Sequence, residues 1–274
     1  MSETQTPRRP VTGFIGLGSQ GGPMAERMLA EGFPLIVWAR RAEALTRFLA
    51  QGARPAASAA ELGAACDHVG VCVVDDAGVA QICDELIPAM QPGSLLAIHS
   101  TILPESCEAL AARCAQQGIA FLDTPVSGGG PAAAARTLTV MCGGSDQAFA
   151  QARPVFECFA GTLLLLGPAG AGQRAKIVNN ALMAANMGAA HAALLAGSAL
   201  GIDRAALAEL IKASSGRSFG FEVYARLPSP DAFAHGAALL AKDLGLLGAI
   251  LQDSAEAQSL SAGASRFLRA AGAI

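Results

Sequence analysis

The stretch Phe14-Ile15-Gly16-Leu17-Gly18-Ser19-Gln20-Gly21 decides the fold of this chain. An apolar strand at residues 11–15 runs into three glycines spaced as G-x-G-x-x-G, and a helix containing Pro23 follows. In such a junction Gly16 allows a tight turn, Gly18 lets the backbone approach a pyrophosphate, and Gly21 lets helix and strand pack closely. The helix N-terminus attracts the anion. We expect a dinucleotide to bind here, with a purely structural turn as the alternative, at Gly16, Leu17, Gly18, Ser19, Gln20 and Gly21.

The first part of the chain alternates strand-like and helix-like segments around this junction. Short apolar runs predict strands at residues 11–15, 35–39, 68–74, 95–99, 119–122, 138–142 and 162–166. Helical segments are predicted between them at residues 23–31, 42–51, 77–90, 105–117 and 146–159. This alternation is typical of a parallel sheet covered on both faces. The sequence therefore predicts an α/β fold, with a doubly wound Rossmann domain over residues 1–167.

The character of the sequence changes after the glycine-rich segment at residues 167–172. Apolar residues then recur at helical spacing, and β-branched runs disappear. Helices are predicted at residues 174–200, 204–214, 237–251 and 255–271. We therefore expect an all-α C-terminal domain over residues 168–274.

Composition narrows the class of partner. The chain has 274 residues, 52% of them hydrophobic and 15% charged, which indicates a large buried core. Its net charge is −3, its sequence contains no block of basic residues, and only 5% of its residues are aromatic. Binding of nucleic acid is therefore not expected, because it needs a cationic surface or stacking platforms. A small-molecule substrate is expected instead.

Cysteine usage and the N-terminus indicate a cytoplasmic protein. The seven cysteines all precede Gly161 and show neither a C-x-x-C pair nor a metal-ligand spacing with histidine, so we expect reduced thiols and no metal. Residues 1–10 lack the apolar stretch of a signal peptide and are predicted to be a short disordered lead. Residues 177–202 are uncharged and long enough to cross a bilayer, but Asn179, Asn180, Asn186 and His191 interrupt them. A helix buried in protein is favoured over a membrane span.

The end of the second predicted strand indicates which cofactor binds. It reads Trp38-Ala39-Arg40-Arg41, with no acidic residue before Glu43. A carboxylate at this place accepts hydrogen bonds from the ribose hydroxyls, whereas a cation accommodates a 2′-phosphate. We therefore expect Arg40 and Arg41 to bind NADP(H). Their alternative role is to begin a solvated helix.

Two further motifs carry polar groups that a core would not require. Asp123-Thr124-Pro125-Val126-Ser127-Gly128-Gly129-Gly130-Pro131 follows a predicted strand, and its amides together with the Ser127 hydroxyl form a candidate nest for a carboxylate. By itself it is equally consistent with a flexible turn. Farther on, Lys176 and Asn180 stand four residues apart near the start of the long helix, so they project from one face. Catalysis is favoured over a lysine that merely extends to solvent.

Together these motifs resemble the β-hydroxyacid dehydrogenases, the 3-hydroxyisobutyrate dehydrogenase family, which is related to the 6-phosphogluconate dehydrogenases. The resemblance runs from Thr12 to Leu247. Besides the motifs above, it includes His99-Ser100-Thr101 before Pro104, Thr137-Leu138-Thr139, Gly172 through Asn180, and Lys242-Asp243-Leu244.

The resemblance implies a role for each matching residue. It makes Lys176 the catalytic acid/base, has Asn180 hold the substrate, and assigns the substrate carboxylate to Ser127, Gly128 and Gly129. Further contacts with the cofactor are expected from the residues at the strand ends and from the last motif, namely Val73, Val74, Thr101 and Lys242.

The implied activity is NADP(H)-dependent interconversion of a small β-hydroxyacid and its semialdehyde or keto acid, by a homodimer or homotetramer packed through the helical domains. An NADPH-dependent imine reductase and a non-catalytic NADP-binding module are the alternatives. Arg136 stands where relatives keep glycine. It is expected either to place a cation at the mouth of the substrate pocket or to be an exposed loop arginine.

Overall fold

The computed structural model describes residues 9–252 and 254–274. Residues 1–8, most of the lead that is expected to be disordered, lie outside the described residues. The chain divides into two compact units, of which the first ends at Lys176 and the second begins at Ile177. This division falls within the long helix at residues 171–199, whereas the boundary predicted from the sequence lies before that helix, at residue 167.

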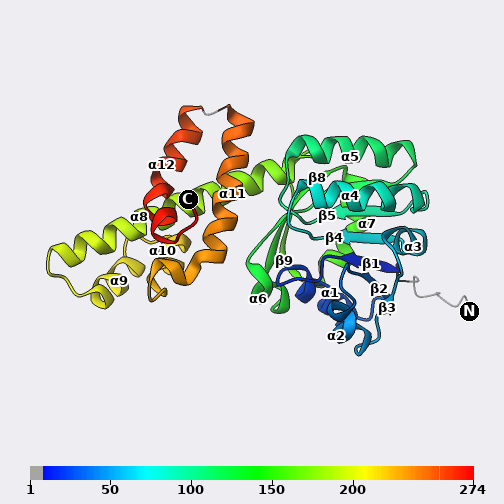
Figure 1. Cartoon of the computed structure of the whole chain (residues 1–274), viewed down its shortest axis with the longest axis horizontal. Helices are drawn as coiled ribbons and strands as arrows, with labels where there is room; N and C mark the ends of the chain where they lie inside the picture. Colours follow the sequence, from blue (N-terminus) through cyan, green and yellow to red (C-terminus); the bar gives the residue numbers. More distant parts are fainter. Residues whose placement is uncertain (1–8, 253) are drawn as a thin grey trace, which may run out of the picture. The chain divides into compact units, whose positions relative to one another are not determined.

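The first unit is an α/β domain (Figure 1). Its strands are β1 (Thr12–Ile15), β2 (Leu35–Trp38), β3 (Arg54–Pro55), β4 (His68–Val71), β5 (Leu95–Ile98), β6 (Ala120–Asp123), β7 (Val126–Ser127), β8 (Leu138–Gly144) and β9 (Ala160–Leu165). Its helices are α1 (Gly21–Ala30), η1 (Ala42–Leu45), α2 (Thr46–Leu49), α3 (Ala59–Ala65), α4 (Asp76–Leu86), η2 (Ile87–Ala89), α5 (Pro104–Gln116), α6 (Gly129–Ala134) and α7 (Asp146–Phe156).

The sheet has the strand order of a doubly wound fold. Neighbouring strands follow the order β3-β2-β1-β4-β5-β6-β8-β7, and β9 pairs with β8. The chain reverses its winding direction between β1 and β4, where Ile15 lies opposite Val71. In open α/β sheets ligands bind outside the carboxyl ends of the strands at such a switch point. The predicted Rossmann fold is confirmed, and the glycine-rich loop after β1 lies at this point.

The central strands of the sheet are parallel, as predicted, and antiparallel pairs occur at one end. Pairing is parallel from β3 to β6 and between β8 and β9, but β8 runs antiparallel to β6 and β7. Residues 128–137, which join β7 to β8, contain only the six-residue helix α6. That connection is shorter than a parallel crossover needs, so the chain returns in the opposite direction.

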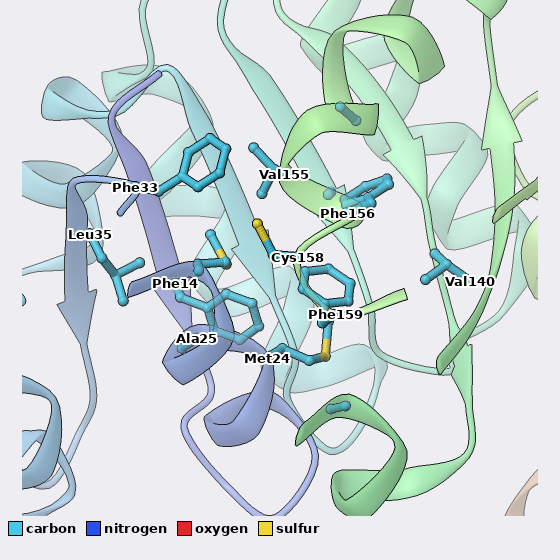
Figure 2. Packing of buried hydrophobic residues seen from close by; sticks show 14 of the residues in the cluster. Phe14, Met24, Ala25, Phe33, Leu35, Val140, Val155, Phe156, Cys158 and Phe159 are labelled. Carbon is cyan, nitrogen blue, oxygen red and sulfur yellow. The ribbon is translucent and has the colours of Figure 1, made fainter. Parts of the chain in front are cut away.

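Each face of the sheet has its own hydrophobic core. On one face α1, α2, α6 and α7 contribute buried residues, with Phe14, Phe156 and Phe159 among the largest side chains (Figure 2). On the other face α3, α4 and α5 pack over β4 and β5 through aliphatic and cysteine side chains. The central strands β1, β4 and β5 are buried on both sides, which explains why they read as continuous apolar runs, whereas β9 has no buried residue.

Two buried histidines belong to this core. The ring of His99 stacks on Phe14 at 5.8 Å, and its Nδ1 lies 3.0 Å from both the carbonyl oxygen and the hydroxyl of Thr124. His68 meets the edge of Phe156 at 5.6 Å. Burial lowers the pKa of His68 to about 3 and that of His99 to about 4, so both rings are neutral at pH 7.

The second unit is all-helical, as predicted. Its helices are the remainder of α8 (Ala171–Ala199), α9 (Arg204–Lys212), α10 (Phe219–Ala225), η3 (Pro230–Phe233), α11 (Ala234–Leu251) and α12 (Ala255–Ala270). The unpredicted α10 begins where the Ser218 hydroxyl accepts a hydrogen bond from the N–H of Phe221. Its residues Phe221 and Tyr224 pack into a core shared with α8, α11 and α12.

No group of three or more His, Cys, Asp and Glu residues within the described part of the chain is arranged to hold a metal ion. All seven cysteines are free, and six of them are buried. The span Pro230–Leu251 is long and apolar enough to cross a bilayer, but helices of soluble cores have the same length and composition. The uncharged span at residues 177–202 does not meet the same criterion.

Candidate active site

Close packing of backbone shapes the glycine-rich loop at the switch point. Gly16 has a φ of +98°, and a Cβ atom added there would lie 2.0 Å from the carbonyl oxygen of Cys72, at the end of β4. A Cβ atom on Gly21 would lie 2.1 Å from the carbonyl oxygen of Gly16. Neither position tolerates a side chain, so both glycines are required for β1, α1 and the end of β4 to approach one another.

The outer side of the same loop has room and polar groups for a phosphate. A Cβ atom added to Gly18 would meet no other atom within 4 Å, so a ligand can approach the backbone there. The first turn of α1 carries no acidic residue, which leaves its N-terminus favourable to an anion. The Nε2 atom of Gln20 is buried and has no hydrogen-bond partner within the described part of the chain. These observations fit a dinucleotide whose pyrophosphate faces residues Gly18–Gln20.

Arg40 and Arg41 follow β2 at the same edge of the sheet. Ile15 pairs with Trp38 in parallel register, so β1 and β2 end side by side, and the two arginines come next along the chain. Both are exposed, and neither forms an ion pair with another described residue. Their side chains therefore follow the carboxyl end of β2, next to the carboxyl end of β1.

The ends of β4 and β5 complete this edge. Val73 donates its backbone N–H to the Ser100 hydroxyl at 2.8 Å, and Val74 is 72% exposed. Thr101 follows Ser100 directly and is half-buried. The structure thus brings Val73, Val74 and Thr101 to the same side of the sheet as the glycine-rich loop.

The Ser127–Gly129 segment also lies against the glycine-rich loop. A Cβ atom on the next residue, Gly130, would lie 2.4 Å from the carbonyl oxygen of Ser19. Gly128 and Gly129 have φ values of +126° and +72°, so the backbone turns sharply between β7 and α6. The possibility of a flexible turn is not realised, because a short strand and a helix enclose these glycines.

The start of α8 is held by two buried polar side chains. Asp123 accepts hydrogen bonds from the backbone N–H of Gly170 at 2.7 Å and of Gln173 at 2.8 Å. Burial raises the pKa of Asp123 to about 6, although its hydrogen bonds from backbone N–H groups act in the opposite direction. Lys176 follows one turn after Gln173 and is 8% exposed. The helix therefore presents Lys176 from a turn that is anchored to β6.

Asn180 lies one helical turn beyond Lys176, in the second unit. Its Nδ2 donates to Oδ2 of Asp243 on α11 at 2.5 Å. The Nζ of Lys242 lies 3.8 Å from Oδ1 of Asp243. Thus Asn180 and Lys242, both named from the sequence, lie on either side of the carboxylate of Asp243.

Three residues of this region were missed as site residues. Gln173 is wholly buried, Asp243 is 3% exposed, and Arg47 donates to the carbonyl oxygen of Leu17 at 3.4 Å while pairing with Glu26. The sequence could have indicated Asp243, because an acidic residue within an otherwise apolar helix requires a polar partner. Nothing in the local sequence indicates that the side chain of Arg47 contacts the loop that follows β1.

The proposal that Arg136 stands at the mouth of the pocket is wrong. Its guanidinium pairs with Glu31 at 3.0 Å and donates to the carbonyl oxygen of Glu157 at 3.3 Å. Glu31 follows the C-terminal end of α1, about 15 Å along the helix from the glycine-rich loop. Arg136 has a φ of +60°, which explains why glycine suits this position. Arg136 is therefore an exposed arginine in the loop after α6, which was the other role expected from the sequence.

Comparison with known proteins covers nearly the whole chain. Residues 11–167 match the family model described as the NAD binding domain of 6-phosphogluconate dehydrogenase. Residues 170–273 match the model described as NAD-binding of NADP-dependent 3-hydroxyisobutyrate dehydrogenase.

Individual proteins agree with these models. The chain is 38% identical over 261 residues to the NAD-dependent L-serine dehydrogenase of Pseudomonas aeruginosa, covering 88% of this chain and 85% of that protein. The solved 3-hydroxyisobutyrate dehydrogenase of Mycobacterium tuberculosis with L-serine has a TM-score of 0.86 and 29% identity, covering 97% of this chain and 94% of that chain. An imine reductase from Pseudomonas sp. has a TM-score of 0.67 but 20% identity, covering 96% and 92%, so it shares the fold alone.

Proposed function

Because the chain belongs to the β-hydroxyacid dehydrogenase family, and is therefore an NAD(P)-dependent hydroxyacid oxidoreductase, we propose that it uses NADP(H) to interconvert a small β-hydroxyacid and its semialdehyde or keto acid. Lys176 is the acid/base of this reaction. The sheet edge around Gly18 holds the cofactor, and the Ser127–Gly129 segment holds the substrate carboxylate.

One observation carries the proposal: a buried lysine and an oriented asparagine stand one turn apart on α8. Lys176 is 8% exposed, and Asn180 has its amide held by Asp243. Residues four apart share one helix face, so both side chains can reach a single small substrate.

The cofactor supplies a hydride acceptor or donor, and the chain supplies binding and a proton. In reduction, the Lys176 ammonium donates a hydrogen bond to the carbonyl oxygen and then transfers a proton to it. In oxidation, neutral Lys176 accepts the hydroxyl proton. Asn180 holds the same region of the substrate, and N–H groups of Gly128 and Gly129 with the Ser127 hydroxyl bind the carboxylate.

The preference for NADP(H) rests on Arg40 and Arg41. These exposed cations follow β2, where a carboxylate would serve the ribose hydroxyls of NAD(H). The family model for residues 170–273 is described with an NADP-dependent enzyme, whereas the P. aeruginosa relative is named NAD-dependent. The arginines therefore favour NADP(H) for this chain, and the NADP(H) pool favours reduction as its direction.

The test is a screen of the purified full chain for NADPH oxidation. Glyoxylate and the succinic, malonic, methylmalonic and tartronic semialdehydes form the panel, each measured in parallel with NADH. We expect turnover of at least one semialdehyde, faster with NADPH than with NADH. Equal rates with both cofactors would contradict the assigned preference, and turnover of none would contradict the substrate class.

The two alternatives give different results in the same screen. An imine reductase would reduce a cyclic imine and leave the semialdehydes unchanged, and a non-catalytic module would bind NADPH without turnover of any carbonyl compound.

We also propose assembly as a homodimer or homotetramer through the helical unit, because α8 exposes Val178, Leu182 and Leu195. Sedimentation equilibrium tests this, and a monomer at all concentrations would contradict it.

A further inference from the structure

The N-terminus of α8 is capped by a carboxylate from a strand far away in the sequence. Asp123 ends β6 and is wholly buried, and its two oxygens accept the N–H groups of Gly170 and Gln173. A buried carboxylate is costly unless such donors satisfy it. The first N–H groups of a helix have no partner within the helix, and their dipole favours negative charge. Asp123 and the start of α8 therefore stabilise each other.

Gln173 adds a second connection to the neighbouring strand end. Its Oε1 accepts the N–H of Ile102 at 3.2 Å, and its Nε2 donates to the carbonyl oxygen of Ser100 at 2.8 Å. The Ser100 hydroxyl in turn accepts the N–H of Val73 at 2.8 Å. One buried amide thus joins the start of α8 to the loops that follow β4 and β5.

The packing leaves the first turn of α8 no room to shift. A Cβ atom on Gly172 would lie 2.3 Å from the carbonyl oxygen of Met141, and one on Gly143 would lie 2.3 Å from Oδ1 of Asp123. Backbone is therefore in direct contact with backbone on this side of the helix. Gln173 precedes Lys176 by three residues, so the turn fixed by these contacts is the one that carries Lys176.

We propose that Asp123 and Gln173 are positioning residues, which hold the first turn of α8 so that Lys176 reaches the substrate oxygen. This inference rests on the proposed function, because it requires Lys176 to act in catalysis. Neither residue touches the reacting atoms, and each acts through the helix. A displacement of about 1 Å can cost roughly 100-fold in rate, so the loss of one anchor is expected to lower kcat.

The experiment uses Gln173→Leu and Asp123→Asn in the full chain, assayed with NADPH and the semialdehyde of the panel that the unaltered protein reduces fastest. We expect kcat to fall about 10- to 100-fold in each variant, with NADPH affinity changed by less than about threefold. Thr12→Val is the matched control. Thr12 is equally buried, but it begins β1 and its hydroxyl donates to the carbonyl oxygen of Pro34, so kcat should change by less than about twofold.

A double-variant cycle distinguishes positioning from a general loss of structure. If Gln173 acts through Lys176, Gln173→Leu should have little further effect on the residual rate of Lys176→Ala. If the rate of the double variant instead fell by the product of the two single-variant losses, the inference would be overturned. Near-normal kcat in Lys176→Ala would instead contradict the proposed function itself, so the two failures are distinguishable.

Amide hydrogen exchange supplies a measurement without turnover. Asp123→Asn replaces an acceptor oxygen with a donor group, and exchange of the amides at residues 171–176 should accelerate at least about tenfold. Thr12→Val should leave exchange of these amides unchanged. Unchanged exchange in Asp123→Asn would show that the carboxylate does not hold the helix, and the inference would fail.

Discussion

The amide of Asn180 on α8 is held by the buried carboxylate of Asp243 on α11, with Nδ2 donating to Oδ2 at 2.5 Å. The other end of the same amide, Oδ1, accepts from Nδ2 of Asn179 at 3.2 Å. Both ends of the group are therefore oriented. A hydrogen bond to a charged acceptor is stronger than one between neutral groups, so Asp243 is the main determinant of this orientation.

Asp243→Ala should raise the KM of the hydroxyacid or semialdehyde about tenfold, because it releases the Asn180 amide. Asn180→Ala should have an effect of similar size. Steady-state kinetics of both variants check this, with Glu209→Gln on the surface of α9 as the control. A normal KM in Asp243→Ala would show that Asn180 does not need this support.

Lys176→Ala should lower kcat by about 10²- to 10⁴-fold, since the lysine donates the proton to the substrate oxygen. NADPH affinity should stay within about twofold, because the lysine acts at the substrate. Measurement of kcat and of the NADPH dissociation constant tests both parts. Lys212→Ala is the control, because Lys212 pairs with Glu209 on α9, and its kcat should be normal.

Replacing Arg40 and Arg41 together with alanine should weaken NADPH far more than NADH. Each charge-assisted contact with a 2′-phosphate contributes about 1.5 to 3 kcal/mol. Trp38 is the single tryptophan of the chain and ends β2, so its fluorescence reports binding of either cofactor. Arg153→Ala on α7 should leave both affinities unchanged. An equal loss of affinity for NADPH and NADH in the double variant would contradict binding of the 2′-phosphate by Arg40 and Arg41.

Arg136→Gly should give a more stable protein than Arg136→Ala, by about 1 kcal/mol. Both variants lose the exposed ion pair with Glu31, but only glycine adopts a φ of +60° without strain. Urea denaturation measures the difference. The ratio of kcat/KM for a dicarboxylic over a monocarboxylic semialdehyde should stay unchanged in both, and a tenfold fall would restore a role for Arg136 in selection.

The free energy of unfolding of the first unit should decrease as the pH falls from 6.5 towards 5. His68 and His99 have lowered pKa values of about 3 and 4 in the folded state, so acid protonates them first in the unfolded chain. Asp123 acts in the opposite sense, because its raised pKa of about 6 makes the folded state bind a proton in this range. The net difference is about one proton, or roughly 1.4 kcal/mol per pH unit.

Urea denaturation followed by Trp38 fluorescence measures this slope. His68→Leu removes one of the two histidines, so the dependence on pH between 6.5 and 5 should become nearly flat. An unchanged slope in this variant would show that His68 is not the source of the acid sensitivity.

Local patterns were sufficient to predict the strands and the cofactor loop. Gly16, Gly18 and Gly21 have the spacing of a βα junction, and the structure shows why two of them tolerate no Cβ atom and the third faces open space. The apolar runs predicted all seven strands of four or more residues in the described part of the chain. All of these except β9 are largely buried, and strands buried on both faces are continuously apolar. The two-residue strands β3 and β7 and the six-residue helix α6 were missed, since they are too short to show a period.

The sequence by itself determined the family, the order of the elements and the residue types of the site, because these depend on spacing along the chain. Only the tertiary structure decided which side chains support that site. Asp123 meets Gly170 across 47 positions, Asn180 meets Asp243 across 63, and Gln173 meets Ser100 across 73. It also placed the guanidinium of Arg136 against Glu31. Contacts over such separations depend on how β6 meets the start of α8 within the first unit and how α11 meets α8 within the second. No local period or motif encodes such long-range contacts.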